Sequence, residues 1–491
     1  YTPPGNETEK ILAEVWEDVL NKKVGIYDNF FEIGCDSIKL ILIAGRLQKR
    51  QIKININDFF AHPTIQKLAV YITSNKGDET VTSKAITRPE SLIAIDIQRD
   101  YDCYLERVKQ EKWPTFAGKN DYKHILITGA AGYLGAYITH ELLKLTDATL
   151  YLPIRGKSQA EAEEKLKKRI VFYFGPDLYN TQKHRLVILK SNLAEKQLGL
   201  SGPYYEKLSQ TVDAIVHSAA NVKHYGDYGE FYKDNVETTG HLLEFAGTGK
   251  KKAFHYISTM DTGSGDIPGK DYLVYTEYTH DEGQKPENVY VKSKFEAEKR
   301  VLAYREKGID TSIYRAANMT FHSETGCFQE NIEGNFFYSM LKVFVKIGFW
   351  SDKMKELEFD LSFVNLAARA IVLLMMQTQL KNETYHICNP HIMSWQDMAI
   401  LLKESGVTLP KVESVNSPEY LLRLESNSEY ERIIESVKLY TRLWEGKQAT
   451  LAVPKMDRTV TLLEKLGFQW PAVTKTHIEK MIKYCKKVGF I

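Results

Sequence analysis

Two residues of the segment Tyr290-Val291-Lys292-Ser293-Lys294 have side chains that can move a proton at a carbonyl oxygen. Tyr290 and Lys294 are four apart, so they share one face if the segment is helical. A phenol has an ordinary pKa of about 10, but a neighbouring ammonium favours the phenolate and lowers that pKa. The pair therefore predicts acid–base chemistry, although an ordinary surface pair on a helix would have the same spacing.

A hydroxyl that could join this pair ends the segment Tyr256-Ile257-Ser258-Thr259. Open α/β sheets bind ligands at the carboxyl ends of their strands. Thr259 and Tyr290 could both donate to the oxygen that becomes negative when hydride reaches a carbonyl carbon. Ser258 is the competing hydroxyl, but alternation along a strand turns it to the other face. We therefore expect Thr259, Tyr290 and Lys294 to form a reduction centre.

A glycine-rich turn between a predicted strand and helix is the second candidate site. Its glycines permit a tight turn, close approach of the backbone to a pyrophosphate, and close packing of helix on strand. The helix N-terminus would offer N–H groups and a positive dipole end to the phosphates. The residues expected to bind a dinucleotide here are Thr128, Gly129, Gly132, Tyr133, Leu134 and Gly135. A merely structural turn is the alternative, which the strand–turn–helix context disfavours.

The end of the next predicted strand indicates which nicotinamide cofactor is used. Arg155 follows that strand, where an acidic residue would bind the ribose hydroxyls of NAD. A guanidinium instead suits the 2′-phosphate of NADP. Arg155 could also be an ordinary solvated charge at the end of a strand. We predict NADPH as the cofactor.

The elements that position these residues alternate from residue 124 onward. Apolar strands are predicted at 124–128, 148–154, 185–190, 212–217 and 253–258, and amphipathic helices at 133–145, 158–171 and 230–246. This order predicts a Rossmann-type, doubly wound parallel sheet with helices on both faces. Beyond about residue 320 the pattern becomes mainly helical, which predicts a C-terminal substrate-binding subdomain.

The N-terminal part of the chain has a different pattern. Apolar residues recur at helical spacing, which predicts a four-helix bundle whose second helix runs from about 37 to 50 and whose last begins after Thr64. Residues 74–90 are polar and read as a flexible linker, followed by a helix around 99–109. We expect four units, at 1–75, 76–120 (linker and entry segment), 121–320 and 321–491. The opening Tyr1-Thr2-Pro3-Pro4 suggests a piece of a longer polypeptide.

Composition excludes several classes of partner and site. The net charge of +2 gives no support for a nucleic-acid or anionic-membrane partner. No apolar run reaches membrane-spanning length, and the N-terminus has no secretory signal pattern. The five cysteines contain no Cys-x-x-Cys pair, which argues against a disulfide framework and a zinc site. We therefore expect a cytoplasmic protein without a metal.

The glycine turn and the Thr259, Tyr290 and Lys294 set resemble the extended short-chain dehydrogenase/reductase superfamily, over roughly residues 121–490. The resemblance implies a Thr-Tyr-Lys triad. It also implies that Asn235 and Arg315 support the site, and that the cofactor contacts five further residues: Asn192, Leu193, Ala219, Ala220 and Asn221. Two departures are Asn192-Leu193 and Val364-Asn365, where the superfamily often has Asp-Leu and Val-Asp.

The segment Phe30-Phe31-Glu32-Ile33-Gly34-Cys35-Asp36-Ser37 resembles the Phe-Phe-x-x-Gly-Gly-Asp-Ser motif of peptidyl carrier proteins, over about residues 5–75. The resemblance implies that Ser37 carries 4′-phosphopantetheine, attached by a phosphopantetheinyl transferase. Cys35 replaces the usual second glycine. Read from the residues alone, Ser37 could instead be a plain helix N-cap.

A carrier followed by a reductase resembles the terminal thioester reductase of nonribosomal peptide synthetases. The resemblance implies that upstream modules deliver an acyl or peptidyl thioester, which NADPH reduces to an aldehyde or onward to an alcohol. Three alternatives remain. They are a non-redox cyclising release domain, a carrier-fused epimerase or dehydratase with bound NAD, and a docking module without catalysis.

Overall fold

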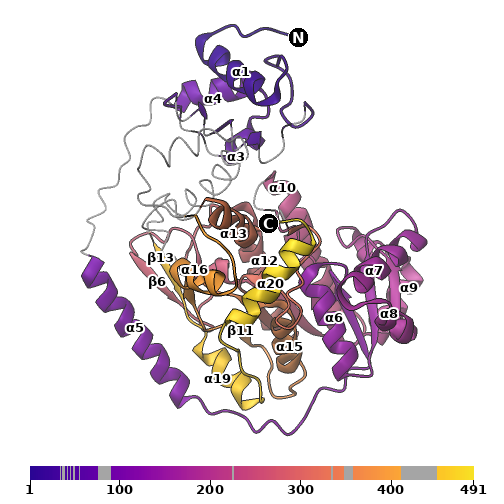
Figure 1. Cartoon of the computed structure of the whole chain (residues 1–491). Helices are drawn as coiled ribbons and strands as arrows, with labels where there is room; N and C mark the ends of the chain where they lie inside the picture. The colour runs from indigo at the N-terminus through magenta and orange to yellow at the C-terminus, as the bar shows by residue number, and fades with distance from the viewer. Residues whose placement is uncertain are drawn as a thin grey trace.

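The structure is a computed structural model, and Figure 1 shows its elements in chain order. It describes residues 1–33, 35, 39–40, 43–44, 46–47, 50–52, 54, 56–75, 90–223, 226–332, 335–347, 358–410 and 450–491. Ser37, half of the predicted helix 37–50 and most of the predicted linker lie outside these residues.

The N-terminal region is helical, as predicted. Its helices are α1 (Glu7–Leu20), α3 (Ile56–Ala61) and α4 (Ile65–Asn75). The rings of Trp16, Phe30 and Phe59 pack together in the core, with the Trp16 and Phe30 centroids 4.3 Å apart. The Lys67 N–H donates to Thr64 Oγ1 at 3.3 Å, which confirms Thr64 as the cap of the last helix. Among the described positions of the predicted second helix, Leu40, Ile43 and Leu47 are buried in this core.

A seven-stranded parallel sheet forms the centre of the rest of the chain. Its strands are β1 (His124–Thr128), β2 (Thr149–Ile154), β3 (Leu186–Lys190), β4 (Ala214–His217), β5 (Ala253–Thr259), β7 (Thr311–Ala316) and β11 (Thr384–Ile387). The spatial order is β11-β7-β5-β4-β1-β2-β3, and every neighbouring pair is parallel. The order reverses beside β1, which is where doubly wound sheets bind nucleotides. The predicted fold class is confirmed.

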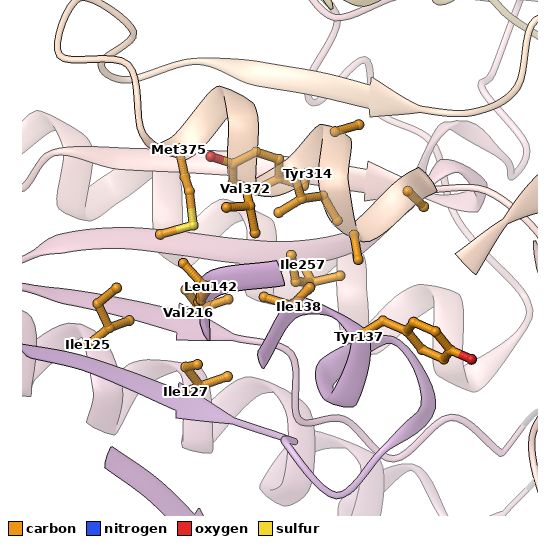
Figure 2. Packing of buried hydrophobic residues seen from close by; sticks show 14 of the residues in the cluster. Ile125, Ile127, Tyr137, Ile138, Leu142, Val216, Ile257, Tyr314, Val372 and Met375 are labelled. Carbon is orange, nitrogen blue, oxygen red and sulfur yellow. The ribbon is translucent and has the colours of Figure 1, made fainter. Parts of the chain in front are cut away.

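Helices cover both faces of the sheet because alternate strand residues point to opposite sides. On one face lie α6 (Tyr133–Leu145), α7 (Gln159–Phe174) and α15 (Val364–Met375). Figure 2 shows Ile125 and Ile127 of β1 packing with Leu142 of α6 and Met375 of α15 in this layer.

The opposite face carries α9 (Gly202–Thr211), α11 (Thr238–Gly247) and α12 (Val289–Glu306). Leu126 and Tyr256 belong to this second core, whereas their sequence neighbours Ile125, Ile127 and Ile257 belong to the first. Shorter elements connect these layers: α8 (Pro176–Gln182), η1 (Lys183–Arg185), η2 (Lys196–Gly199), α10 (Tyr228–Phe231), η3 (Tyr232–Glu237) and η4 (Met260–Gly263).

The sheet continues past residue 320, where we expected the nucleotide-binding unit to end. β11 pairs with β7, and α15 packs on α6, so both belong to the central layers. Adding β11 covers an edge that β7 would otherwise expose. The sequence pattern is weak here because β11 has only four residues, Thr384–Ile387.

A second apolar core lies beyond the sheet and is mainly helical, as predicted. It is built on α13 (Phe336–Ile347), α16 (Trp395–Glu404) and α20 (Lys475–Lys487). Three two-stranded pairs accompany these helices: β8 (Met319–Thr320) with β10 (Ser362–Phe363), β9 (Glu358–Phe359) with β12 (Met393–Ser394), and β6 (Tyr272–Tyr275) with β13 (Leu451–Pro454).

Helix α5 (Glu90–Gln110) is longer than the helix predicted around 99–109 and runs along the outside of the unit built on the central sheet (Figure 1). It contacts β6 and α19 (Asp457–Lys465). The Tyr104 hydroxyl donates to Glu277 at 2.7 Å, and Arg458 of α19 pairs with Glu111 just past the end of α5. This helix is therefore part of the sheet-containing unit rather than a free spacer.

Candidate active site

The glycine turn has the backbone that a pyrophosphate requires. Gly129 has φ of 76°, and a Cβ there would lie 2.7 Å from the Ala219 nitrogen. A Cβ at Gly135 would collide with the Gly129 carbonyl. Helix α6 begins after Gly132 with no side-chain cap, so its first N–H groups can meet a ligand. The turn fits the phosphates of a dinucleotide.

Thr128 links the turn to β4. Its hydroxyl accepts from the Ala219 N–H at 3.1 Å and lies 2.7 Å from His217 Nδ1. The other ring nitrogen of His217 lies 3.1 Å from the Thr239 hydroxyl. Burial, with Lys294 nearby, lowers the pKa of His217 to about 3, so the ring is neutral and serves as a bridge between strands and helix. This buried bridge holds Ala219 beside the turn.

Tyr133 and Leu134, also expected at the cofactor, occupy the first turn of α6. The Tyr133 hydroxyl donates to the Thr320 carbonyl at 2.7 Å, and its ring packs against the cores on both sides. Tyr133 therefore ties the turn to the C-terminal core through its side chain. Any contact it makes with a dinucleotide comes from its backbone N–H.

Three further predicted cofactor residues, Arg155, Asn192 and Leu193, lie past the carboxyl ends of β2 and β3. Arg155 follows β2, is 66% exposed, and lies 3.3 Å from an Asp234 carboxylate oxygen. Asn192 follows β3 and donates to Glu195 at 2.7 Å, while the Leu193 carbonyl lies 3.1 Å from His241 Nδ1. The exposed guanidinium leaves room for an anionic group at the strand end.

Asn235, which we expected to support the site, makes three side-chain hydrogen bonds. It lies in η3, a π-helical segment, a rare conformation that is frequent at functional sites. Its side-chain amide oxygen accepts from the Asn221 N–H at 2.7 Å, and its nitrogen donates to the Asn221 carbonyl at 3.0 Å and the Ser293 hydroxyl at 2.8 Å. Ser293 in turn donates to the Tyr290 carbonyl at 2.7 Å. Asn235 therefore connects the segment after β4, which contains Asn221, to the start of α12, which contains Tyr290.

The start of α12 sets the position of Tyr290. The Asn288 side chain caps this helix by accepting from the Tyr290 and Val291 N–H groups at 3.0 and 3.2 Å. Tyr290 is thus in the first turn and Lys294 one turn later, on the predicted shared face.

Lys294 is buried and anchored to the sheet. Its ammonium donates to the Ile257 carbonyl at 2.6 Å and lies 4.3 Å from the centre of the Tyr256 ring. Burial lowers the pKa of Lys294 to about 7, and the Glu298 carboxylate acts in the opposite direction. The lysine therefore titrates near neutrality, which differs from the permanent cation expected from sequence.

Thr259 and Tyr290 come together at the end of β5. Burial raises the pKa of Tyr290, the Asp261 charge raises it further, and the Thr259 hydroxyl acts in the opposite direction. Thr259 Oγ1 also lies 3.4 Å from Asp261 Oδ2. We expected a lowered phenol pKa, but the structure raises it because burial disfavours the phenolate. Ser258, the competing hydroxyl, faces Glu298 instead, whose pKa it helps to lower.

Two residues of this site were missed in the sequence. Asp261 lies beside Thr259, and Glu298 follows Lys294 by one helical turn. Arg315, expected to support the site, does so through Glu298: its Nε and Nη2 donate to the two carboxylate oxygens at 3.1 and 2.7 Å. The spacing of four between Lys294 and Glu298 is a signal, but most glutamates at such spacing are solvated.

Two kinds of site are absent from the part of the chain that the structure describes. No group of three or more His, Cys, Asp or Glu side chains is placed to hold a metal ion within these ranges. Nor does any described helix combine the length and apolar character needed to cross a bilayer.

Comparison with protein families matches two parts of the chain. Residues 10–72 match the phosphopantetheine attachment site family, and residues 127–371 match the family described as male sterility protein, an NAD-binding domain. The glycine turn and the reducing residues fall in the second match.

Individual relatives contain the same two parts. A linear gramicidin synthase of Brevibacillus parabrevis is 26% identical over 499 residues, covering 100% of this chain and 9% of that protein. The L-2-aminoadipate reductase of Eremothecium gossypii, in its large subunit, is 25% identical over 488 residues, covering 92% of this chain and 33% of that protein. The chain thus spans a third or less of these relatives.

Two solved structures are similar over most of their length. A thiolation–reductase di-domain from an archaeal nonribosomal peptide synthetase superposes with a TM-score of 0.79 at 26% identity, covering 100% of this chain and 99% of that one. The terminal R domain from the myxalamid biosynthetic pathway gives a TM-score of 0.65 at 25% identity, covering 76% of this chain and 92% of that one.

Proposed function

We infer that the chain is a thiolation–reductase didomain, a phosphopantetheine attachment domain joined to an extended short-chain dehydrogenase/reductase. From this we propose that it releases an acyl or peptidyl thioester from its own carrier by NADPH-dependent reduction to an aldehyde. Upstream synthetase modules would supply the acyl chain. Ser37 would hold it through a 4′-phosphopantetheine that a phosphopantetheinyl transferase attaches.

In this proposal the triad would provide the proton and the positive charge that the reaction needs. Bound NADPH would supply the hydride. Thr259 and Tyr290 would donate to the thioester oxygen as it becomes negative, and Tyr290 would transfer its proton there. The raised pKa of Tyr290 keeps the phenol protonated, which is the form that reduction requires. Thioester, NADPH and one proton would give aldehyde, carrier thiol and NADP⁺.

The choice of NADPH rests on Arg155. Its guanidinium is exposed at the end of β2, the position that faces the adenosine ribose in this fold. It would pair with the 2′-phosphate, at the expense of its 3.3 Å contact with Asp234. An Arg155→Ala variant should lose about ten- to a hundredfold in NADPH affinity and little in NADH affinity, because only NADPH has the 2′-phosphate. Fluorescence titration with both cofactors measures this.

The observation that carries the proposal is the meeting of Thr259, Tyr290 and Lys294 beside a dinucleotide turn in a chain with its own carrier. The test loads the carrier with a synthetic acyl-phosphopantetheine, adds NADPH, and identifies products by mass spectrometry while NADPH oxidation is counted. Tyr290→Phe should slow release about 100- to 10,000-fold, since it removes the acid. Ser37→Ala should abolish loading and leave NADPH binding intact.

The outcomes separate the alternatives. Release without NADPH oxidation would indicate a cyclising domain. Cofactor that stays bound through purification, with no net oxidation, would indicate an epimerase or dehydratase. Unchanged release by Tyr290→Phe would contradict the assignment of Tyr290 as the acid.

A further inference from the structure

A buried carboxylate lies directly behind the reducing residues. Glu298 belongs to the third turn of α12, one turn after Lys294 and two after Tyr290. Its side chain is 4% exposed, and the guanidinium that pairs with it, that of Arg315, is 0% exposed. A carboxylate this buried has a strong influence on neighbouring charges because little water screens it.

The arginine that pairs with Glu298 is itself held in place from several directions. Its Nη1 donates to the Thr279 carbonyl at 2.8 Å and lies 3.3 Å from His386 Nε2. The guanidinium also stacks over Tyr275, 4.5 Å from the ring centre. Elements on both sides of Arg315 therefore keep Glu298 in one orientation.

Glu298 also contacts the strand end that carries Thr259. The Thr262 hydroxyl lies 3.2 Å from Glu298 Oε1 and 2.8 Å from the Thr259 carbonyl. The same hydroxyl lies 2.8 Å from the Tyr275 hydroxyl, which can supply a further proton to this cluster. Glu298 thus contacts one neighbour of Thr259 and shares a helix with Tyr290 and Lys294.

We propose that Glu298 is a positioning residue that keeps Lys294 in its ammonium form and holds the Thr259 strand end against α12 during reduction. Burial acts to discharge Lys294, and the Glu298 carboxylate opposes this. Burial also acts to neutralise Glu298, but Arg315 outweighs it and lowers the pKa of Glu298. Arg315 therefore keeps the carboxylate charged, and the carboxylate keeps the lysine charged.

The charged and titratable groups around Lys294 come from four elements. They are Tyr290 and Glu298 on α12, Tyr256 on β5, His217 on β4 and, beside Tyr290, Asp261 in η4. His217 and Tyr256 are neutral at neutral pH because burial lowers the pKa of the first and raises that of the second. The Asp261 charge raises the pKa of Tyr290, whereas the Glu298 charge raises the pKa of Lys294.

The inference rests on the proposed reduction, and its test separates the two. Single-turnover NADPH oxidation with a small acyl thioester, and NADPH affinity, are measured against pH for the wild-type didomain and for Glu298→Gln. The wild-type rate should fall as the pH rises through about 7, where Lys294 loses its proton. In Glu298→Gln this fall should begin about one pH unit lower, giving about a tenfold loss of rate at pH 8 and convergence with wild type below about pH 5.

Glu111→Gln is the matched control, because it also neutralises a carboxylate held by two nitrogens of an arginine, but this carboxylate bonds Arg458 of α19 and Tyr278 rather than α12. Its pH profile should equal that of the wild type even if its stability falls. If Glu298→Gln does not fold, the double variant Glu298→Gln/Arg315→Met, which removes both buried charges, takes its place. Its pH profile of NADPH oxidation should be shifted by the same amount.

An unchanged profile, or a loss of rate equal at every pH, would overturn the proposal for Glu298. Absence of NADPH oxidation by the wild type would instead overturn the proposed function.

Discussion

Two arginine–glutamate pairs of the reductase have the same chemistry and different surroundings. Arg315 and Glu298, with side-chain exposures of 0% and 4%, lie behind the reducing residues. Arg458 and Glu111, with exposures of 7% and 24%, join α19 to the end of α5 and are less completely buried. Both arginines donate through Nε and Nη2. The difference in burial decides what each pair does. The inner pair, Arg315 and Glu298, influences the charges of the site, whereas the outer pair, Arg458 and Glu111, holds α5 against α19.

Removing the inner arginine should have the largest effect on stability. Arg315→Met leaves a buried carboxylate without its partner, which costs about 3–5 kcal/mol of the free energy of unfolding. Chemical denaturation followed by circular dichroism measures this loss. A loss below about 1 kcal/mol would show that water reaches Glu298 and would remove the distinction between the pairs.

Removing the outer arginine should cost less. In Arg458→Met the Glu111 carboxylate can turn toward water, so we expect a loss of about 1–3 kcal/mol in the same measurement. The rate of reduction per folded molecule should be unchanged, because Arg458 contacts α5 and Glu383 rather than the triad. A fall in the rate of reduction per folded molecule of Arg458→Met would contradict the assignment of separate roles.

The smallest effect is a dependence of stability on acid pH. Burial acts to raise the pKa of Glu111, but hydrogen bonds from Arg458 and Tyr278 outweigh it and lower that pKa. A carboxyl with a lowered pKa stabilises the fold fully above its unfolded pKa, about 4.5, and loses this contribution as the pH falls further. Glu111→Gln should therefore lose less stability than the wild type between pH 5 and 3, by no more than about 1 kcal/mol. Equal acid sensitivity would show that the outer pair adds nothing.

Local patterns predicted much of the fold and the site. The glycine turn is recognisable because one strand, three glycines and one helix follow each other within residues 124–145. Tyr290 and Lys294 are recognisable because helical spacing places them on one face. Both features depend only on residues close together in sequence, so they can be predicted from the sequence alone.

The rest depends on contacts between distant residues. Glu298 and Arg315 are 17 positions apart, and Arg458 and Glu111 are 347 apart, so no local pattern pairs them. The pKa of Tyr290 was predicted in the wrong direction because burial, which a sequence does not display, and the Asp261 charge raise it. The continuation of the sheet through β11 was missed for the same reason, since its partner β7 lies about 70 residues earlier.

The attachment of α5 determines where the reductase can be separated from its carrier. A cut near residue 120, just ahead of β1, would remove Tyr104 and Glu111 and leave the buried Glu277 and Arg458 facing solvent. A cut ahead of Glu90 keeps the helix and its partners together. The boundary of the catalytic unit is therefore set by α5, which begins at Glu90, well before the first strand of the sheet at His124. Domain exchange between synthetases should transfer that helix with the enzyme.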